Sequence, residues 1–185
     1  MVAWPRQMRN MADKISYFRE GLKNLRTVGT ITRSSSFLCK RMVEKIDPRP
    51  GLNVAELGAG DGVITHHILN HLPVDSQLFA FELLPNMCEY LHKIDDDRLI
   101  VVEDSAEAIG RHLQANDVES LDYILSAIPF VALPNDLGYK IIGECKKYLK
   151  PGGKFIQIHY SLLAKKLYEE AFGNVRVTFV PWNIP

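Results

Sequence analysis

The sequence has few cysteines: three among 185 residues, at positions 39, 88 and 145. They form neither a Cys-x-x-Cys motif nor an even-numbered framework, so the sequence predicts no metal site. This usage is typical of buried thiols in a reducing compartment.

Long apolar runs are also lacking. No segment reaches the ~18 uninterrupted apolar residues of a membrane-spanning helix. Residues 1–14 are basic and mixed, without the apolar core of a signal peptide. The length suits one domain with a real hydrophobic core. We therefore expect a single domain over 1–185, with an N-terminal segment 1–50 and a core 51–185.

Net charge is zero overall but unevenly distributed. Residues 1–50 hold eleven Lys and Arg against four Asp and Glu, a net charge of +7, and the remainder carries −7. A basic arm on an acidic body indicates an anionic partner, either nucleic acid or a membrane surface.

The arm is predicted to hold two helices. Apolar residues from Met8 to Leu25 recur at three- and four-residue steps, and basic residues fill much of the remaining surface. Periodicity alone favours a helix packed on the domain over an interfacial helix lying on anionic lipid. A second helix, over about 35–46, follows serines and threonines that can cap it.

After residue 50, strand-like and helix-like segments alternate, separated by Pro and Gly. Such alternation predicts a mostly parallel central sheet with helices on both faces. The strands are expected at 53–57, 77–82, 98–103, 121–126, 153–159 and 175–180, and the helices at about 62–72, 85–94, 105–115, 135–149 and 161–172.

A glycine-rich turn joins the first strand to the first helix of this core. Gly58, Gly60 and Gly62 follow an apolar run that ends in Glu56, and a second acid, Glu82, closes the next strand. Glycine accepts positive φ and lets a ligand lie against bare backbone. Glu82 has nearly the spacing at which an acid meets a ribose hydroxyl in Rossmann-like folds, but the third Gly comes one residue early for a dinucleotide motif.

Glu-x-Gly-x-Gly-x-Gly followed by that acid resembles motif I of class I S-adenosylmethionine (SAM) methyltransferases. The resemblance implies an α/β, Rossmann-like fold and SAM as cofactor. Carboxylates near the loop suit the cationic sulfonium and ammonium of SAM. The implied cofactor-binding residues are Glu56, Gly58, Ala59, Gly60, Asp61, Gly62, Glu82, Leu83, Asp104, Ser105, Ala106 and Ser126.

Three later strand ends face the same crevice of such a fold. Asp104 follows the third strand, where it can accept from the adenine amine or cap the next helix. Residues 126–130 follow the fourth strand, where the methyl acceptor is expected. Residues 157–160 end the fifth strand, where a lone His or Tyr is more often structural than catalytic.

Closer similarity is to bacterial phospholipid N-methyltransferases of the phosphatidylethanolamine type. It rests on residues 18–41, the Ser-Ala-Ile-Pro of 126–129, the Pro-Gly-Gly of 151–153 and the Trp-Asn-Ile-Pro of 182–185. The resemblance implies methyl transfer from SAM to the amine of phosphatidylethanolamine. It also implies a cytoplasmic protein, peripherally bound to the inner face of the membrane, and favours the interfacial interpretation of the basic helix.

This reaction assigns roles to further residues. The candidate catalytic residues are Ser126, His159 and Tyr160. Aromatic faces suit methylated ammonium intermediates. The candidate substrate-binding residues are Tyr17, Phe18, Ile128, Phe130, Tyr160 and Asn183.

The sequence also departs from that family. Arg33 stands where Pro is usual and Asp61 where Thr is common. The family continues past Asn-Ile-Pro into a last strand, which we expect to be missing here. The rival interpretation is an RNA adenine N6-methyltransferase, whose Asn-Pro-Pro-aromatic motif residues 126–130 match only in part. A small-molecule methyltransferase and a non-catalytic SAM-binding protein also stay open, but the sequence favours a lipid acceptor over nucleic acid.

Overall fold

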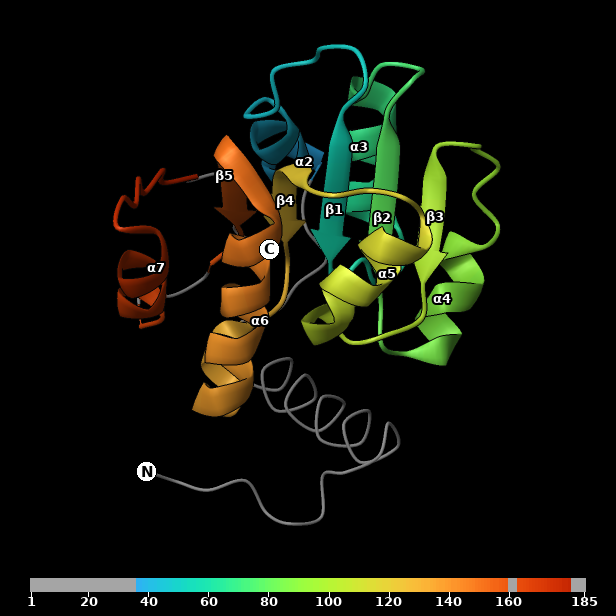
Figure 1. Ribbon diagram of the computed structural model, residues 1–185. Coiled ribbons are helices and arrows are strands. Elements are labelled where there is room, and N and C mark those ends of the chain that lie inside the picture. The colour runs from blue at the N-terminus through green and yellow to red at the C-terminus, as the bar shows by residue number, and fades with distance from the viewer. Residues whose placement is uncertain (1–35, 160–162, 181–185) are drawn as a thin grey trace.

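A five-stranded parallel sheet forms the centre of the computed structural model, which describes residues 36–159 and 163–180, apart from the side chain of Asn135 (Figure 1). The strand order is β3-β2-β1-β4-β5. All four neighbouring pairs are parallel, as predicted. The strands are β1 (Asn53–Leu57), β2 (Gln77–Phe81), β3 (Leu99–Val102), β4 (Leu121–Ser126) and β5 (Leu149–Gln157).

Helices cover both faces of the sheet, as the alternating pattern predicts. In Figure 1, α2 and α3 lie behind the sheet, whereas α5 and α6 lie in front of it. The helical elements are α2 (Ser36–Val43), α3 (Val63–His71), α4 (Pro85–Leu91), η1 (Ala106–Ala108), α5 (Ile109–Ala115), η2 (Phe130–Ala132), α6 (Asn135–Tyr148) and α7 (Lys165–Phe172).

Alternation along β1 divides the hydrophobic core between these two layers. Leu57 points to the cluster that contains residues of α5 and α6. Val54 points to the opposite cluster, which contains residues of α2 and α3. Successive side chains of a strand face opposite sides, so Glu56 lies on the α2 and α3 side with Val54. The alternation of side chains along β1 therefore places Glu56 on the face of the sheet that α2 and α3 cover.

The Pro-Gly-Gly segment lies inside β5, although we predicted a strand that begins only at 153. The pairing with β4 shifts register there, between Leu121 and Tyr123. A side chain at Gly153 would come within 2.8 Å of the Asp122 carbonyl oxygen, and Gly152 has a φ of +80°. Glycine therefore permits an irregular, tightly paired start of β5. The Pro and Gly residues by themselves indicate a turn at this place.

The strand predicted over 175–180 is wrong, because residues 174–180 form no regular element. Val177 and Phe179 are exposed. Side-chain alternation predicts a strand only where a neighbour supplies ladder hydrogen bonds, and none of the described pairings includes this segment. The helix predicted over 105–115 is instead split into η1 and α5.

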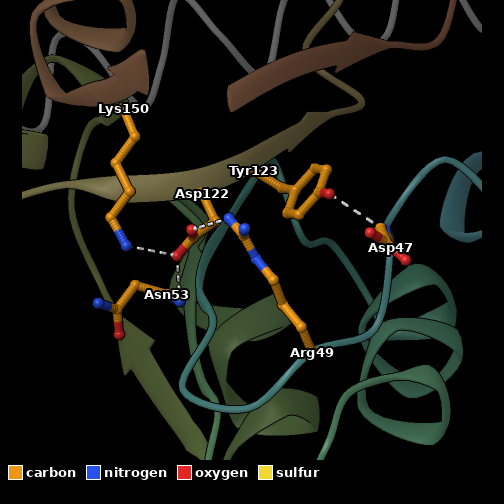
Figure 2. A network of polar contacts seen from close by, with 6 residues as sticks. All are labelled: Asp47, Arg49, Asn53, Asp122, Tyr123 and Lys150. Atoms are coloured by element: carbon orange, nitrogen blue, oxygen red, sulfur yellow. Dashed lines mark hydrogen bonds and ion pairs between the residues drawn. The ribbon is translucent and has the colours of Figure 1, made fainter. Parts of the chain in front are cut away.

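A buried carboxylate fastens the connector between α2 and β1 to the sheet (Figure 2). Asp122, at the start of β4, accepts from Arg49 Nη2 at 2.9 Å, the Asn53 amide at 3.0 Å and Lys150 Nζ at 2.8 Å. Burial raises the pKa of Asp122, but these partners outweigh it and hold the pKa below its usual value. This network lies at the end of the sheet opposite the glycine turn and gives β1 a fixed start.

Candidate cofactor and acceptor site

The glycine turn runs from the end of β1 to the start of α3 with three left-handed residues. Gly58, Gly60 and Gly62 have φ of +76°, +59° and +84°, which residues with a side chain rarely adopt. A Cβ on Gly58 would lie 3.2 Å from Ile128 Cγ1, whereas one on Gly60 would meet nothing within 4 Å. The turn is therefore packed on one side and open at its middle, as close approach of a ligand requires.

Glu82 holds this turn in place from the end of β2. Its Oε2 accepts from the Gly60 amide, and its Oε1 accepts from the Leu83 and Leu84 amides, each at 2.8 Å. Burial raises the pKa of Glu82 despite these bonds. A carboxylate accepts about four hydrogen bonds, so these three leave one acceptor position of Glu82 available to a ligand.

Glu56 is the most deeply buried carboxylate beside the turn, with 1% of its surface exposed. Its Oε2 accepts from the Thr65 hydroxyl of α3 at 2.6 Å, while its Oε1 has no hydrogen-bond partner. Burial raises the pKa of Glu56 to about 8, with Thr65 opposing the shift and Glu82 adding to it. A buried acceptor without a donor is costly, so this oxygen suits a cationic donor from a ligand.

Asp104 follows β3 and is held mainly from α5. Its Oδ1 accepts from the Ser105 amide at 2.8 Å, and its Oδ2 accepts from His112 Nε2 at 2.8 Å and from Arg111 Nη2. Burial raises the pKa of Asp104. Hydrogen bonds from His112, the Ser105 amide and Arg111 lower it by more, so the pKa of this carboxyl lies below its usual value. Asp104 is therefore a fixed, charged acceptor.

The ends of β4 and β5 are tied together where the methyl acceptor is predicted to lie. The Ser126 hydroxyl accepts from the Ile128 amide at 3.2 Å, and its carbonyl accepts from the Ile158 amide at 3.0 Å. Gln157 Nε2 donates to the Ile128 and Ile158 carbonyls at 2.9 and 2.7 Å, and its buried Oε1 has no partner. This arrangement fixes the turn that follows β4.

An aromatic group lies behind that turn. Phe130 is buried and meets Tyr168 of α7 edge to face, with ring centroids 5.8 Å apart. His159 Nε2 lies 2.5 Å from the Tyr168 hydroxyl, and burial lowers the pKa of His159. His159 is therefore favoured as neutral imidazole, while Phe130 packs in the core, where its contact with a methylated substrate stays a prediction.

The structure brings most of the predicted cofactor residues to one edge of the sheet. Glu56, the glycine turn, Glu82, Asp104 and Ser126 come from the carboxyl ends of four neighbouring strands, the edge at which open α/β sheets bind ligands. Asp61 follows Gly60 in the turn, and Leu83, Ser105 and Ala106 flank their acids. The predicted basic helix lies outside the described residues. So do four further candidates: Tyr17, Phe18, Tyr160 and Asn183.

Sequence reasoning missed the side chains that hold these acids and His159. Thr65, Arg111, His112 and Tyr168 each pair with a site residue seven to nine positions away in the chain. The available signal was helical phase, which indicates only that residues of α3 and α5 face the sheet. Among the described residues, no group of three or more His, Cys, Asp and Glu side chains could hold a metal ion.

The family model described as "Methyltransferase domain" matches residues 54–153, which run from β1 through the glycine turn into β5. The chain belongs to this family. It is a SAM-dependent methyltransferase with the Rossmann-like fold of its relatives, and the predicted fold, enzyme class and cofactor are confirmed.

One curated relative of this methyltransferase is the ornithine lipid N-methyltransferase of Singulisphaera acidiphila. It is 27% identical over 178 residues, which cover 95% of this chain and 93% of the relative. The methyltransferase is thus similar along nearly its whole length to an enzyme named for a lipid acceptor.

Solved structures show the same fold. A putative rRNA methylase from Clostridium thermocellum is 15% identical, with a TM-score of 0.59 over 80% of this chain and 83% of that one. A precorrin-6y C5,15-methyltransferase from Geobacter metallireducens is 18% identical, with a TM-score of 0.59 over 77% and 75%. Aeropyrum pernix fibrillarin, solved with natively bound SAM, is 15% identical, with a TM-score of 0.50 over 59% of this chain and 46% of that one.

The site fits SAM in the features that the fold exposes. Gly60 leaves open space above the turn, Glu82 keeps one acceptor position, and the Oε1 atom of Glu56 lacks a donor. A ribose hydroxyl and an ammonium group are donors of the kind that these acids lack. SAM supplies a methyl group on a sulfonium, and these residues would hold its ribose and amino-acid ends.

Proposed function

We propose that this methyltransferase transfers methyl groups from SAM to the primary amine of a membrane-lipid head group. The supporting observation is the similarity to an ornithine lipid N-methyltransferase across 95% of this chain and 93% of that enzyme. The similarity of residues 126–129 and 151–153 to phosphatidylethanolamine N-methyltransferases adds the second candidate head group. Ornithine lipid and phosphatidylethanolamine both present a primary amine, so the proposal names that amine.

Such a transfer asks the protein mainly for alignment. Holding two reactants in line replaces a bimolecular encounter and lowers the barrier by several kcal/mol. The turn over 126–130 is rigid enough for this role, since Ser126 and Gln157 fix it by hydrogen bonds from two strands. Ser126 and Ile128 are buried at the base of the proposed acceptor position.

The amine must also lose its proton before it attacks. Burial disfavours the ammonium form, so an apolar crevice promotes the loss. His159 is favoured as neutral imidazole and stands two residues after the end of β5. We propose His159 as the proton acceptor on this side of the site, with Tyr168 fixing its ring.

The cofactor contacts complete the proposal. Glu82 would accept from the ribose through its remaining position, and Asp104 would accept from the exocyclic amine of adenine through Oδ1. Ser105 and Ala106, both buried beside Asp104, would border the ring. These assignments place donors of the cofactor on acceptors that the fold already holds in position.

Membrane association is proposed from charge. The +7 arm over residues 1–50 suits an anionic lipid surface, which attracts basic segments by about 1 kcal/mol per Lys or Arg near it. Among the described residues no helix is long and apolar enough to cross a bilayer. From the charge of this arm and the resemblance to phospholipid N-methyltransferases, we propose a peripheral protein at the cytoplasmic face of the membrane.

The decisive experiment offers three acceptors to the purified protein with methyl-labelled SAM. Anionic vesicles carry either phosphatidylethanolamine or ornithine lipid, and the third reaction contains unmodified ribosomal RNA. We expect label in lipid, and the favoured vesicle identifies the head group. Label in RNA alone would overturn the proposal and recast residues 1–50 as a nucleic-acid arm.

Two controls keep this experiment interpretable. Glu82→Ala should abolish transfer through loss of SAM, because Glu82 holds the turn through the Gly60 amide and is the proposed acceptor for the ribose. Vesicles of phosphatidylcholine, whose amine is already quaternary, should take no label. Incorporation into those vesicles would show that the label does not reach an amine.

A further inference from the structure

Two donors from one helix converge on one oxygen of Asp104. His112 Nε2 donates to Oδ2 at 2.8 Å, and the guanidinium of Arg111 reaches the same atom. His112 is in turn held edge to face against Phe81, with ring centroids 5.7 Å apart. The carboxylate is therefore clamped from the α5 side.

The clamp leaves a defined acceptor free. A carboxylate offers about four acceptor positions, two on each oxygen. Oδ2 is filled by Arg111 and His112, whereas Oδ1 receives only the amide of Ser105. One position on Oδ1 remains, and Asp104 lies at the carboxyl end of β3, on the edge that carries the glycine turn.

We propose that His112 and Arg111 are positioning residues that make Asp104 select a purine with an exocyclic amine over one with an oxo group. An amine donates to the carboxylate, but an oxo group offers a second acceptor and is repelled. A buried carboxyl without its two donors could take up a proton and donate to the oxo group, or rotate away. The donors prevent both, so the site rejects a deaminated cofactor.

This inference rests on the proposed contact between Asp104 and adenine. Its test is binding of S-adenosyl-L-homocysteine and of its deaminated analogue, S-inosyl-L-homocysteine, to the full-length protein by titration calorimetry. The measured quantity is the ratio of the two dissociation constants. Neither ligand carries a transferable methyl group, so the result is independent of the lipid assay and its outcome.

The wild-type protein should prefer the adenosyl ligand at least about tenfold, since hydrogen bonds to charged groups are among the strong ones. Arg111→Met and His112→Phe should each lower that preference several-fold. Arg111 is 71% exposed, so its replacement leaves the core intact. His112→Phe keeps the ring against Phe81, and His112→Gln, which retains a donor, should restore part of the preference.

His92→Phe is the matched control for His112→Phe. His92 binds Glu103, the neighbour of Asp104, at 2.7 Å, and both side chains are about half exposed. This variant removes a His–carboxylate contact of the same kind without touching Asp104, and the preference should not change.

Three results would overturn the inference. Equal binding of both ligands by the wild-type protein would separate Asp104 from adenine. Weakening of both ligands by the same factor in Arg111→Met and His112→Phe would make the clamp purely structural. An equal loss of preference in His92→Phe and His112→Phe would make the effect a general loss of local charge pairing.

Discussion

The unusual state of Glu56 gives a direct prediction about stability. Burial raises its pKa to about 8, whereas a Glu in an unfolded chain titrates near 4.3. Between these values the folded protein holds a proton that the unfolded chain does not. Linkage then makes the free energy of unfolding fall as pH rises through this window.

The size of the effect follows from the same two values. The gap is about 3.7 pH units at 1.36 kcal/mol each, so ionisation of Glu56 should cost about 5 kcal/mol in total. The expected slope is about −1.4 kcal/mol per pH unit between about pH 5 and pH 8. The raised pKa of Glu82 also makes stability fall with pH, whereas the lowered pKa of His159 makes it rise. The contribution of Glu56 must therefore be isolated by comparing the wild-type protein with a variant.

Glu56→Gln supplies that difference, because an amide of the same shape does not titrate. Urea unfolding of both proteins across this pH range, without SAM, gives the difference in unfolding free energy. The unfolding free energy of the wild-type protein minus that of Glu56→Gln should fall steadily as pH rises. Thr65→Val should extend this fall to higher pH, because it removes the donor that opposes the rise in the pKa of Glu56. A difference independent of pH would refute the buried, protonated Glu56.

Further predictions concern the turn, the connector and the cofactor. Gly58→Ala should destabilise the fold by more than the ~1–2 kcal/mol that a left-handed backbone costs a residue with a side chain, because its Cβ also meets Ile128 at 3.2 Å. Gly60→Ala should lose only that backbone contribution, since its Cβ meets nothing within 4 Å. Equal losses of unfolding free energy in urea would contradict the contact between Gly58 and Ile128. Asp122→Asn should cost about 2 kcal/mol at neutral pH, since it weakens bonds to two exposed cations. That loss should shrink as acid protonates the wild-type carboxylate, whose pKa is lowered, and a pH-independent loss in acid titrations of stability would contradict this. SAM binding at neutral pH should release a proton from Glu56, measured by calorimetry in buffers of different ionisation enthalpy; no proton exchange would separate Glu56 from the cofactor.

Much of the sheet could be predicted from the sequence, because parallel strands are short apolar runs with clear ends. The bounds of β1 and β4 match the predicted 53–57 and 121–126. Prediction failed where long-range pairing decides. The chain over 175–180 has a strand pattern, but no described strand pairs with it. β5 begins with a Pro-Gly-Gly segment, in which Gly153 permits the close approach to the Asp122 carbonyl.

The site divides in the same way. The acids and glycines could be predicted, since each follows a strand that ends at one edge of the sheet. Their hydrogen-bond partners could not, because the side chains of Thr65 and His112 reach the site only through the packing of α3 and α5. The sequence also gave no sign that Glu56 would be left with an unpaired oxygen.

The central claim, methylation of a lipid amine, is tested most directly by lipid analysis in cells. The full-length protein is expressed in a bacterium that makes phosphatidylethanolamine or ornithine lipid but no methylated form of either. We predict mono-, di- or trimethylated head groups in the mass spectrum of the lipid extract, absent with Glu82→Ala. An unchanged lipid profile beside a stable, SAM-binding protein would contradict the account.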